Sequence, residues 1–138
     1  MNPVQKAGPT PLIAVVDDDD SLRSSTRMLI ASFGYRAAAF GRAQDLLRWP
    51  LLGEVSCLIL DILMPEMNGL ELQRRLSQIR PRLPIIFITA RAKEHEERQA
   101  LNGGAVAVLR KPLPAGVLLR ALRAALPPGV DRGEAVNR

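Results

Sequence analysis

Short apolar runs alternate with amphipathic segments five times along the chain. The apolar runs have the length of β-strands and consist mostly of Val, Ile, Leu and Ala; they are Leu12–Val16, Tyr35–Phe40, Val55–Leu60, Pro84–Thr89 and Ala105–Leu109. The segments after them are typical of helices that end near Gly or Pro; they are Ser21–Phe33, Arg42–Trp49, Leu70–Ile79, Lys93–Leu101 and Ala115–Leu126. The pattern therefore predicts five strands, each followed by a helix.

Strands that are apolar almost throughout indicate a parallel sheet covered by helices on both faces, an α/β fold. Right-handed crossovers leave few strand orders, and we predict the flavodoxin-like (βα)5 arrangement with order 2-1-3-4-5. A chain of 138 residues suits one domain, which we place at 12–126. We expect a flexible N-terminal arm at 1–11 and a flexible tail or linker at 127–138.

Composition and charge narrow the classes of function. A hydrophobic content of 47% argues against a disordered chain. The apolar runs are too short to span a bilayer, and no signal-length segment precedes the first strand, so we expect a cytoplasmic protein without membrane contact. The net charge of +5 comes from scattered arginines, and aromatic residues are scarce, so we expect no direct nucleic-acid binding by this domain.

Asp61 is the strongest single candidate for chemistry. A carboxylate directly after a buried-looking run is costly unless it has a partner or a task. Pro65 and the pair Asn68-Gly69 interrupt regular structure just beyond it, so Asp61 stands where a strand opens into a loop. Ligands of α/β sheets bind outside the carboxyl ends of the strands. We therefore expect Asp61 to belong to a ligand site.

Four consecutive aspartates follow the first strand. Asp19 and Asp20 are explained as residues at the start of the next helix, where acids are favourable. Asp17 and Asp18 are not, and the predicted strand order places them beside Asp61, where three carboxylates would repel one another. A Mg2+ ion removes that repulsion and also binds phosphate oxygens. The sequence thus predicts a magnesium site.

Thr89 and Lys111 add a hydroxyl and an ammonium group at the ends of two further strands. Together with a carboxylate nucleophile and a bound cation, they are the parts of a phosphoryl-transfer site. Asp61 would attack phosphorus in line, while the metal and Lys111 offset the charge on the other phosphoryl oxygens.

These residues resemble the motifs of a CheY-like receiver domain of a two-component response regulator. The likeness runs from about Leu12 to Leu126; the matching motifs are Asp17-Asp18, Asp61-Ile62-Leu63-Met64-Pro65, Thr89-Ala90 and Lys111-Pro112. The run Gly104-Ala105-Val106 is also similar to FixJ-type receivers, which usually precede a DNA-binding domain. The output is left open: a stand-alone receiver, or a piece of a longer regulator.

The resemblance implies a phosphorelay phosphoprotein. Asp61 would accept a phosphoryl group from a histidine kinase or a histidine phosphotransfer protein, as an aspartyl phosphate. Asp18 and Asp61 would bind Mg2+ directly and Asp17 through water; the backbone carbonyl of Leu63 would complete the protein ligands. Thr89 and Lys111 would contact the phosphoryl group, and the Lys111–Pro112 peptide bond would be cis. Such a protein catalyses only its own phosphorylation and dephosphorylation, so it is not a turnover enzyme.

Val108 departs from the family pattern, which usually has Tyr or Phe three residues before the lysine. In the family this aromatic swings inward together with the switch threonine, here Thr89, and valine cannot make that movement. Either the face formed by the fourth helix and fifth strand switches by another route, or phosphorylation is weakly coupled to output. By resemblance, the same face is the expected surface for a partner or a homodimer.

Two alternative functions are kept. One is a receiver that acts mainly as a binding module insensitive to phosphorylation, which the valine at position 108 motivates. The other is a Mg2+-dependent phosphohydrolase that forms an aspartyl phosphate. That class needs a second acid two residues after the nucleophile, where this chain has Leu63, and we expect no cap domain.

Overall fold

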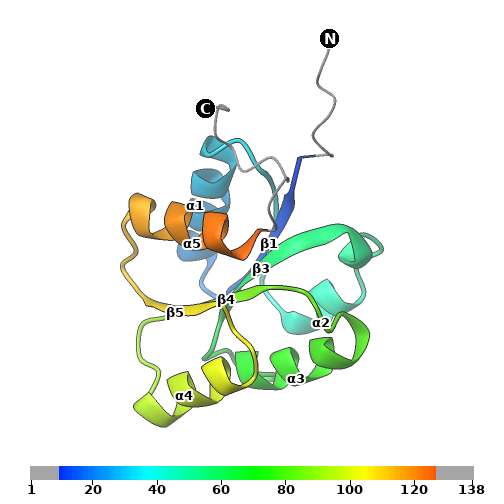
Figure 1. Ribbon diagram of the computed structural model, residues 1–138, viewed down its shortest axis with the longest axis vertical. Helices are drawn as coiled ribbons and strands as arrows, with labels where there is room; N and C mark the ends of the chain where they lie inside the picture. The colour runs from blue at the N-terminus through cyan, green and yellow to red at the C-terminus, as the bar shows by residue number, and fades with distance from the viewer. Residues whose placement is uncertain (1–9, 127–138) are drawn as a thin grey trace.

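The computed structural model describes residues 10–126 as a five-stranded parallel sheet of order β2-β1-β3-β4-β5 (Figure 1). The strands are β1 (Leu12–Val16), β2 (Arg36–Phe40), β3 (Val55–Asp61), β4 (Ile85–Thr89) and β5 (Ala107–Arg110). The predicted strand order is therefore confirmed. Except for residues 10 and 11, the predicted arm and tail lie outside the described residues.

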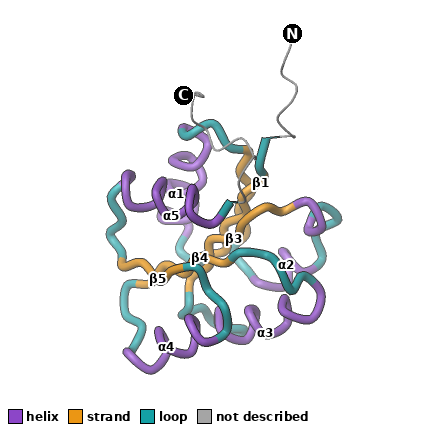
Figure 2. Tube along the Cα trace, in the orientation of Figure 1, coloured by secondary structure: helices purple, strands orange, loops and turns teal. Residues whose placement is uncertain are grey.

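Helices cover both faces of the sheet (Figure 2). They are α1 (Asp20–Ser32), α2 (Ala43–Leu47), α3 (Gly69–Ile79), α4 (Glu94–Asn102) and α5 (Ala115–Ala125), with a 3-10 turn at Leu52–Glu54. The helices α1 and α5 lie on one face, and α2, α3 and α4 lie on the other. None of the helices within residues 10–126 is long and apolar enough to cross a membrane.

Each face of the sheet has its own hydrophobic core, because alternate side chains of a strand point to opposite faces. On β3, Leu58 and Leu60 belong to the core under α2, α3 and α4, and Ile59 belongs to the core under α1 and α5. All three side chains are completely buried. This two-sided burial explains why the central strands are apolar at nearly every position.

The helix starts follow from capping residues in the sequence. The Asp19 side chain accepts a hydrogen bond from the backbone N–H of Leu22 at 3.0 Å and caps α1, so the predicted helix-start role of this aspartate is confirmed. Asn68 caps α3 in the same way, accepting from the N–H of Glu71 at 3.0 Å. Both caps stand directly after loops at the carboxyl edge of the sheet, so they fix where those loops end.

The fifth strand begins two residues later than the sequence pattern predicts. Gly104 has φ +102°, and the N–H of Ala105 bonds back to the carbonyl of Ala100 at 3.1 Å. Both residues therefore form the turn that closes α4. Val106 then makes its backbone bond to Ile85, and the strand proper starts at Ala107. Ala105 therefore closes the helix, and Val106 already bonds to β4 just ahead of the regular strand.

Candidate functional site

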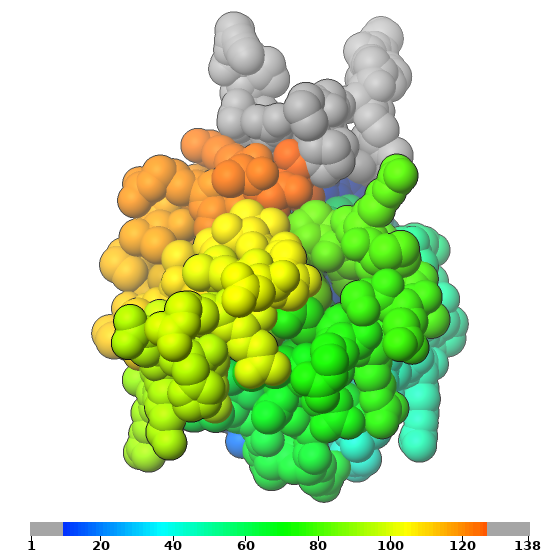
Figure 3. All heavy atoms as spheres, turned by 60° about the horizontal axis from the view of Figure 1, so that its bottom comes forward, coloured from blue at the N-terminus to red at the C-terminus, as the bar shows by residue number. Residues whose placement is uncertain are grey.

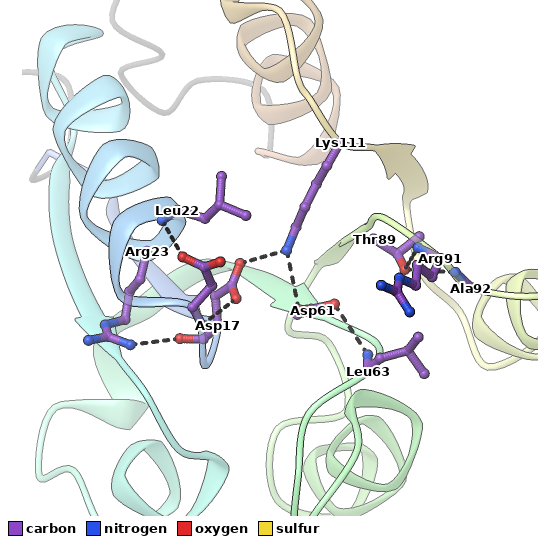
Figure 4. Close-up of polar contacts among 10 residues, drawn as sticks. Asp17, Leu22, Arg23, Asp61, Leu63, Thr89, Arg91, Ala92 and Lys111 are labelled. Carbon is purple, nitrogen blue, oxygen red and sulfur yellow. Dashed lines mark hydrogen bonds and ion pairs between the residues drawn. The ribbon is translucent and has the colours of Figure 1, made fainter.

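The strand order brings the predicted site residues to one edge of the sheet (Figure 4). Asp17 follows β1, Asp61 ends β3, Thr89 ends β4 and Lys111 follows β5. The chain reverses its direction of winding between β1 and β3, which pair with each other. This switch point opens a crevice at the carboxyl ends of the strands, the usual place for a ligand in such sheets.

Lys111 joins the two sides of this crevice. Its Nζ lies 3.0 Å from Asp17 Oδ2 and 3.2 Å from Asp61 Oδ2. Asp17 is fully buried, Asp61 nearly so, and 11% of the Lys111 side chain is exposed. One ammonium group thus offsets two carboxylates that would otherwise face each other with little water between them.

Hydrogen bonds on both oxygens hold the Asp17 carboxylate in place. One of its carboxylate oxygens accepts the backbone N–H of Asp19 at 3.0 Å, and the other contacts Lys111. Its backbone carbonyl accepts from Nη1 of Arg23 at 2.9 Å, and Nη2 of that arginine contacts Asp20 at 2.6 Å. The role of Arg23 was missed in the sequence; its spacing from Asp20 could have indicated the ion pair, but not the bond to the Asp17 carbonyl.

The side chains of Asp17, Asp18 and Asp61 form a cluster of oxygen donors. One carboxylate oxygen from each lies within 4.8 Å of the others, and Asp18 is exposed whereas the other two are buried. Around one Mg2+ ion, opposite ligands lie about 4.2 Å apart and adjacent ones about 3 Å, with water at the remaining positions. Three hard oxygen donors this close together, one of them facing solvent, are a donor set suited to this ion.

The electrostatics of the pair Asp61 and Lys111 reflect the burial of both groups. Burial raises the pKa of Asp61 to about 6; the charge of Lys111 opposes this rise and the charge of Asp17 adds to it. Burial by itself would lower the pKa of Lys111, but hydrogen bonds and charges from the two aspartates outweigh it, so that pKa is raised. Lys111 therefore stays charged, and Asp61 is ionised at neutral pH.

Thr89 lies fully buried at the end of β4. Its Oγ1 accepts hydrogen bonds from the backbone N–H groups of Ala92 at 3.0 Å and Arg91 at 3.3 Å. Because a hydroxyl accepts through its lone pairs and donates through its hydrogen, Thr89 can still donate one hydrogen bond. The residue also lines a cleft of about 440 Å³; the lining includes Asp18, Asp61, Leu63, Thr89, Arg91 and Lys111.

The remaining predicted positions are Leu63, the Lys111–Pro112 peptide bond and Val108. The backbone N–H of Leu63 donates to Asp61 Oδ1 at 3.2 Å, while metal binding by its carbonyl stays a prediction. The Lys111–Pro112 peptide bond is cis, as expected. Val108 pairs with Phe87 in the sheet and is partly buried against the core, away from the cleft lining.

A family model described as the response regulator receiver domain matches residues 13–123. The chain belongs to this family and is a receiver domain of the two-component kind. It belongs to a signalling family rather than to a classical enzyme family.

Relatives and solved structures agree with this assignment. Nodulation protein W of Bradyrhizobium diazoefficiens is 38% identical over 124 residues, which cover 90% of this chain and 55% of that protein. A receiver protein structure from Burkholderia phymatum is 36% identical with a TM-score of 0.74 and covers 88% of this chain and 98% of that one. The FixJ-N crystal structure is 26% identical with a TM-score of 0.75, and the match covers 86% of this chain and 94% of that one. The chain spans about half the length of the curated relatives it matches, 55% and 52% for two of them.

Proposed function

We propose that this receiver accepts a phosphoryl group on Asp61 from a histidine kinase or a histidine phosphotransfer protein, in a Mg2+-dependent reaction. The observation that carries the proposal is the position of Lys111 Nζ, 3.2 Å from Asp61 and 3.0 Å from Asp17. A buried carboxylate held beside a cation and at the mouth of a cleft is suited to be a nucleophile toward phosphorus.

Each residue has a defined part in the transfer. An oxygen of Asp61 forms a bond to phosphorus while the bond from phosphorus to the donor histidine nitrogen breaks, and the imidazole then takes up a proton. Lys111 and the hydroxyl of Thr89 face the phosphoryl oxygens that gain charge. Later attack by water on phosphorus releases phosphate and restores the Asp61 carboxylate, so the chain acts only on itself.

Asp18 and Asp61 are the proposed direct ligands of Mg2+, with the Leu63 carbonyl as a third. Asp17 is proposed to act through water, and its hydrogen bonds with Asp19 and Lys111 hold its carboxylate beside the other acids. When bound, the ion neutralises charge on the acids and on the incoming phosphoryl oxygens.

The wider context is also a proposal. Because the matched relatives extend well beyond the matched region, we infer that residues 12–126 are the receiver of a longer cytoplasmic regulator, between an arm at 1–11 and a linker at 127–138. Likeness to FixJ-type receivers favours a DNA-binding output domain. A homodimer through α4 and β5 is the proposed result of phosphorylation.

The phosphoacceptor is tested by mass spectrometry after incubation of the chain with Mg2+ and acetyl phosphate. We expect a mass gain of one phosphoryl group, located at Asp61, that requires Mg2+ and is absent from Asp61→Asn. Asp45→Asn is the matched control, because Asp45 is an exposed aspartate of α2 away from the cleft. Equal labelling of Asp61→Asn and wild type would rule the proposal out, and multiple turnover of small phosphomonoesters would favour the phosphohydrolase instead.

A further inference from the structure

Ala92 links the candidate site to Arg110. Its N–H donates to Thr89 Oγ1 at 3.0 Å, and its carbonyl accepts a long hydrogen bond from Nη1 of Arg110 at 3.4 Å. Ala92 is buried, 5% exposed, in the loop between β4 and α4. The N–H and the carbonyl of Ala92 therefore connect the hydroxyl of Thr89 with Arg110 of β5.

Arg110 continues this connection to α4. Its Nη2 forms an ion pair with Oε2 of Glu97, which lies within the first turns of α4. In the sheet, Arg110 pairs with Thr89, and it directly precedes Lys111. The side chain of Arg110 thus contacts both the β4–α4 loop and α4, while its backbone lies beside Thr89 in the sheet. Thr89, Ala92, Arg110 and Glu97 form an unbroken chain of contacts from the cleft to α4.

The valine at position 108 makes this chain of contacts important. Valine has no aromatic ring, so the inward ring swing that is usual in the family is absent from this strand. Figure 3 shows α4 (yellow-green) and the following segment (yellow) on an open face beside α3 and α5. Two apolar side chains there, Leu101 and Val106, are 49% and 39% exposed. A partner on this face would sense a shift of α4.

We propose that Arg110 is a positioning residue that holds the β4–α4 loop and transmits the state of Thr89 to α4. This inference rests on the proposed function, since it begins with a phosphoryl oxygen on Asp61 that accepts the Thr89 hydroxyl hydrogen. Movement of Thr89 toward the cleft draws the N–H of Ala92 with it. The Ala92 carbonyl then changes its contact with Arg110, and the ion pair moves α4. The two arrangements of loop and helix form the two-state element that the site biases.

Arg98 offers a matched control for this role. It is an exposed arginine of the same helix, and its ion pair, 3.5 Å to Glu94, stays within α4. Its removal therefore changes the charge of α4 without breaking a contact to the loop. The side chain of Arg110 is 56% exposed, so its replacement leaves the two hydrophobic cores intact.

The test uses beryllofluoride with Mg2+ as a phosphoryl mimic on four proteins: wild type, Arg110→Gln, Glu97→Gln and Arg98→Gln. Fluorine NMR measures binding of the mimic, and nitrogen-edited NMR measures the change it causes at the backbone amides of 94–102. We expect binding in all four proteins. The change at α4 should fall about threefold in Arg110→Gln and Glu97→Gln but not in Arg98→Gln.

The double variant Arg110→Gln/Glu97→Gln separates coupling from simple loss of structure. If the two residues act through one ion pair, the double variant responds no less than either single variant. Arg110→Lys should respond like Arg110→Gln, because one ammonium group replaces the two guanidinium nitrogens that contact Ala92 and Glu97 separately. Normal binding with an unchanged α4 response in both single variants would overturn this inference alone. No binding of the mimic by wild type would overturn the proposed function and this inference with it.

Discussion

At the scale of single residues, Gly69 shows how closely α3 approaches the candidate phosphoacceptor. A Cβ atom at this position would lie 2.4 Å from the backbone oxygen of Asp61 and 3.0 Å from Cε1 of Phe87. The Gly69 N–H donates to the carbonyl of Ile62 at 2.7 Å, which holds the start of α3 against the end of β3. The glycine therefore leaves space that the peptide of Asp61 fills.

Gly69→Ala is predicted to disturb stability and the site together. The added methyl group meets backbone atoms, so the peptide after Asp61 must shift, and we expect the free energy of unfolding to fall by about 1–3 kcal/mol. Beryllofluoride affinity should fall as well, measured by fluorine NMR beside urea unfolding. Gly53→Ala is the matched control, because nothing lies within 4 Å of a Cβ there. Equal stability and affinity of the two variants would contradict this interpretation.

At the scale of elements, most strands and helices could be predicted because the pattern of apolar residues shows which of their faces are buried. The apolar pattern located β1, β3 and β4 within about a residue, since these strands are buried on both faces. The start of β5 was placed too early, because Ala105 is apolar yet bonds back to the end of α4, and Val106 bonds to Ile85 just ahead of the regular strand. Only the backbone hydrogen bonds distinguish an apolar residue that closes a helix from one that opens a strand.

The candidate site was predictable for the same reason, and its limits are equally physical. Residues that follow parallel strands must meet at one edge, so Asp17, Asp61 and Lys111 could be grouped before their distances were known. The hydrogen bonds made by Arg23 and Arg110 could not be predicted. Their long side chains reach backbone carbonyls, and such a contact has no signature in the sequence.

The burial of β3 predicts the reactivity of Cys57. Burial raises the pKa of this thiol to about 12 against an ordinary value of 9.0, so the thiolate is scarce in the folded chain. At pH 8 we expect reaction with a disulfide reagent about a thousandfold slower than in the urea-unfolded chain. Since the unfolded thiol loses its proton first, the free energy of unfolding should decrease as pH rises from about 9 to 12, by about 1.4 kcal/mol at pH 10. In Cys57→Ala, the decrease in the free energy of unfolding that comes from this thiol should be absent. Rapid reaction of the Cys57 thiol in the folded chain would contradict its burial.

At the scale of the whole molecule, function and stability make opposing demands on one edge of the sheet. Within residues 10–126, Asp17 and Asp61 are buried and acidic, and a single lysine serves both. The fold brings these groups together from the ends of three different strands, so their repulsion acts against the whole sheet rather than one loop. A cation that binds only the folded chain offsets this repulsion and stabilises the molecule.

Asp61→Asn should therefore make the metal-free chain more stable while removing its response to Mg2+. Loss of one buried charge relieves the repulsion, and Lys111 keeps its contact with Asp17, so we expect the free energy of unfolding to rise by about 1 kcal/mol in a chelating buffer. In wild type, Mg2+ at several times its dissociation constant should raise stability by about 1 kcal/mol, and in the variant by much less. Urea unfolding with and without Mg2+ measures both effects, with Asp45→Asn as the control. A metal-free variant less stable than wild type would show instead that the Lys111–Asp61 ion pair stabilises the fold more than the crowded carboxylates oppose it.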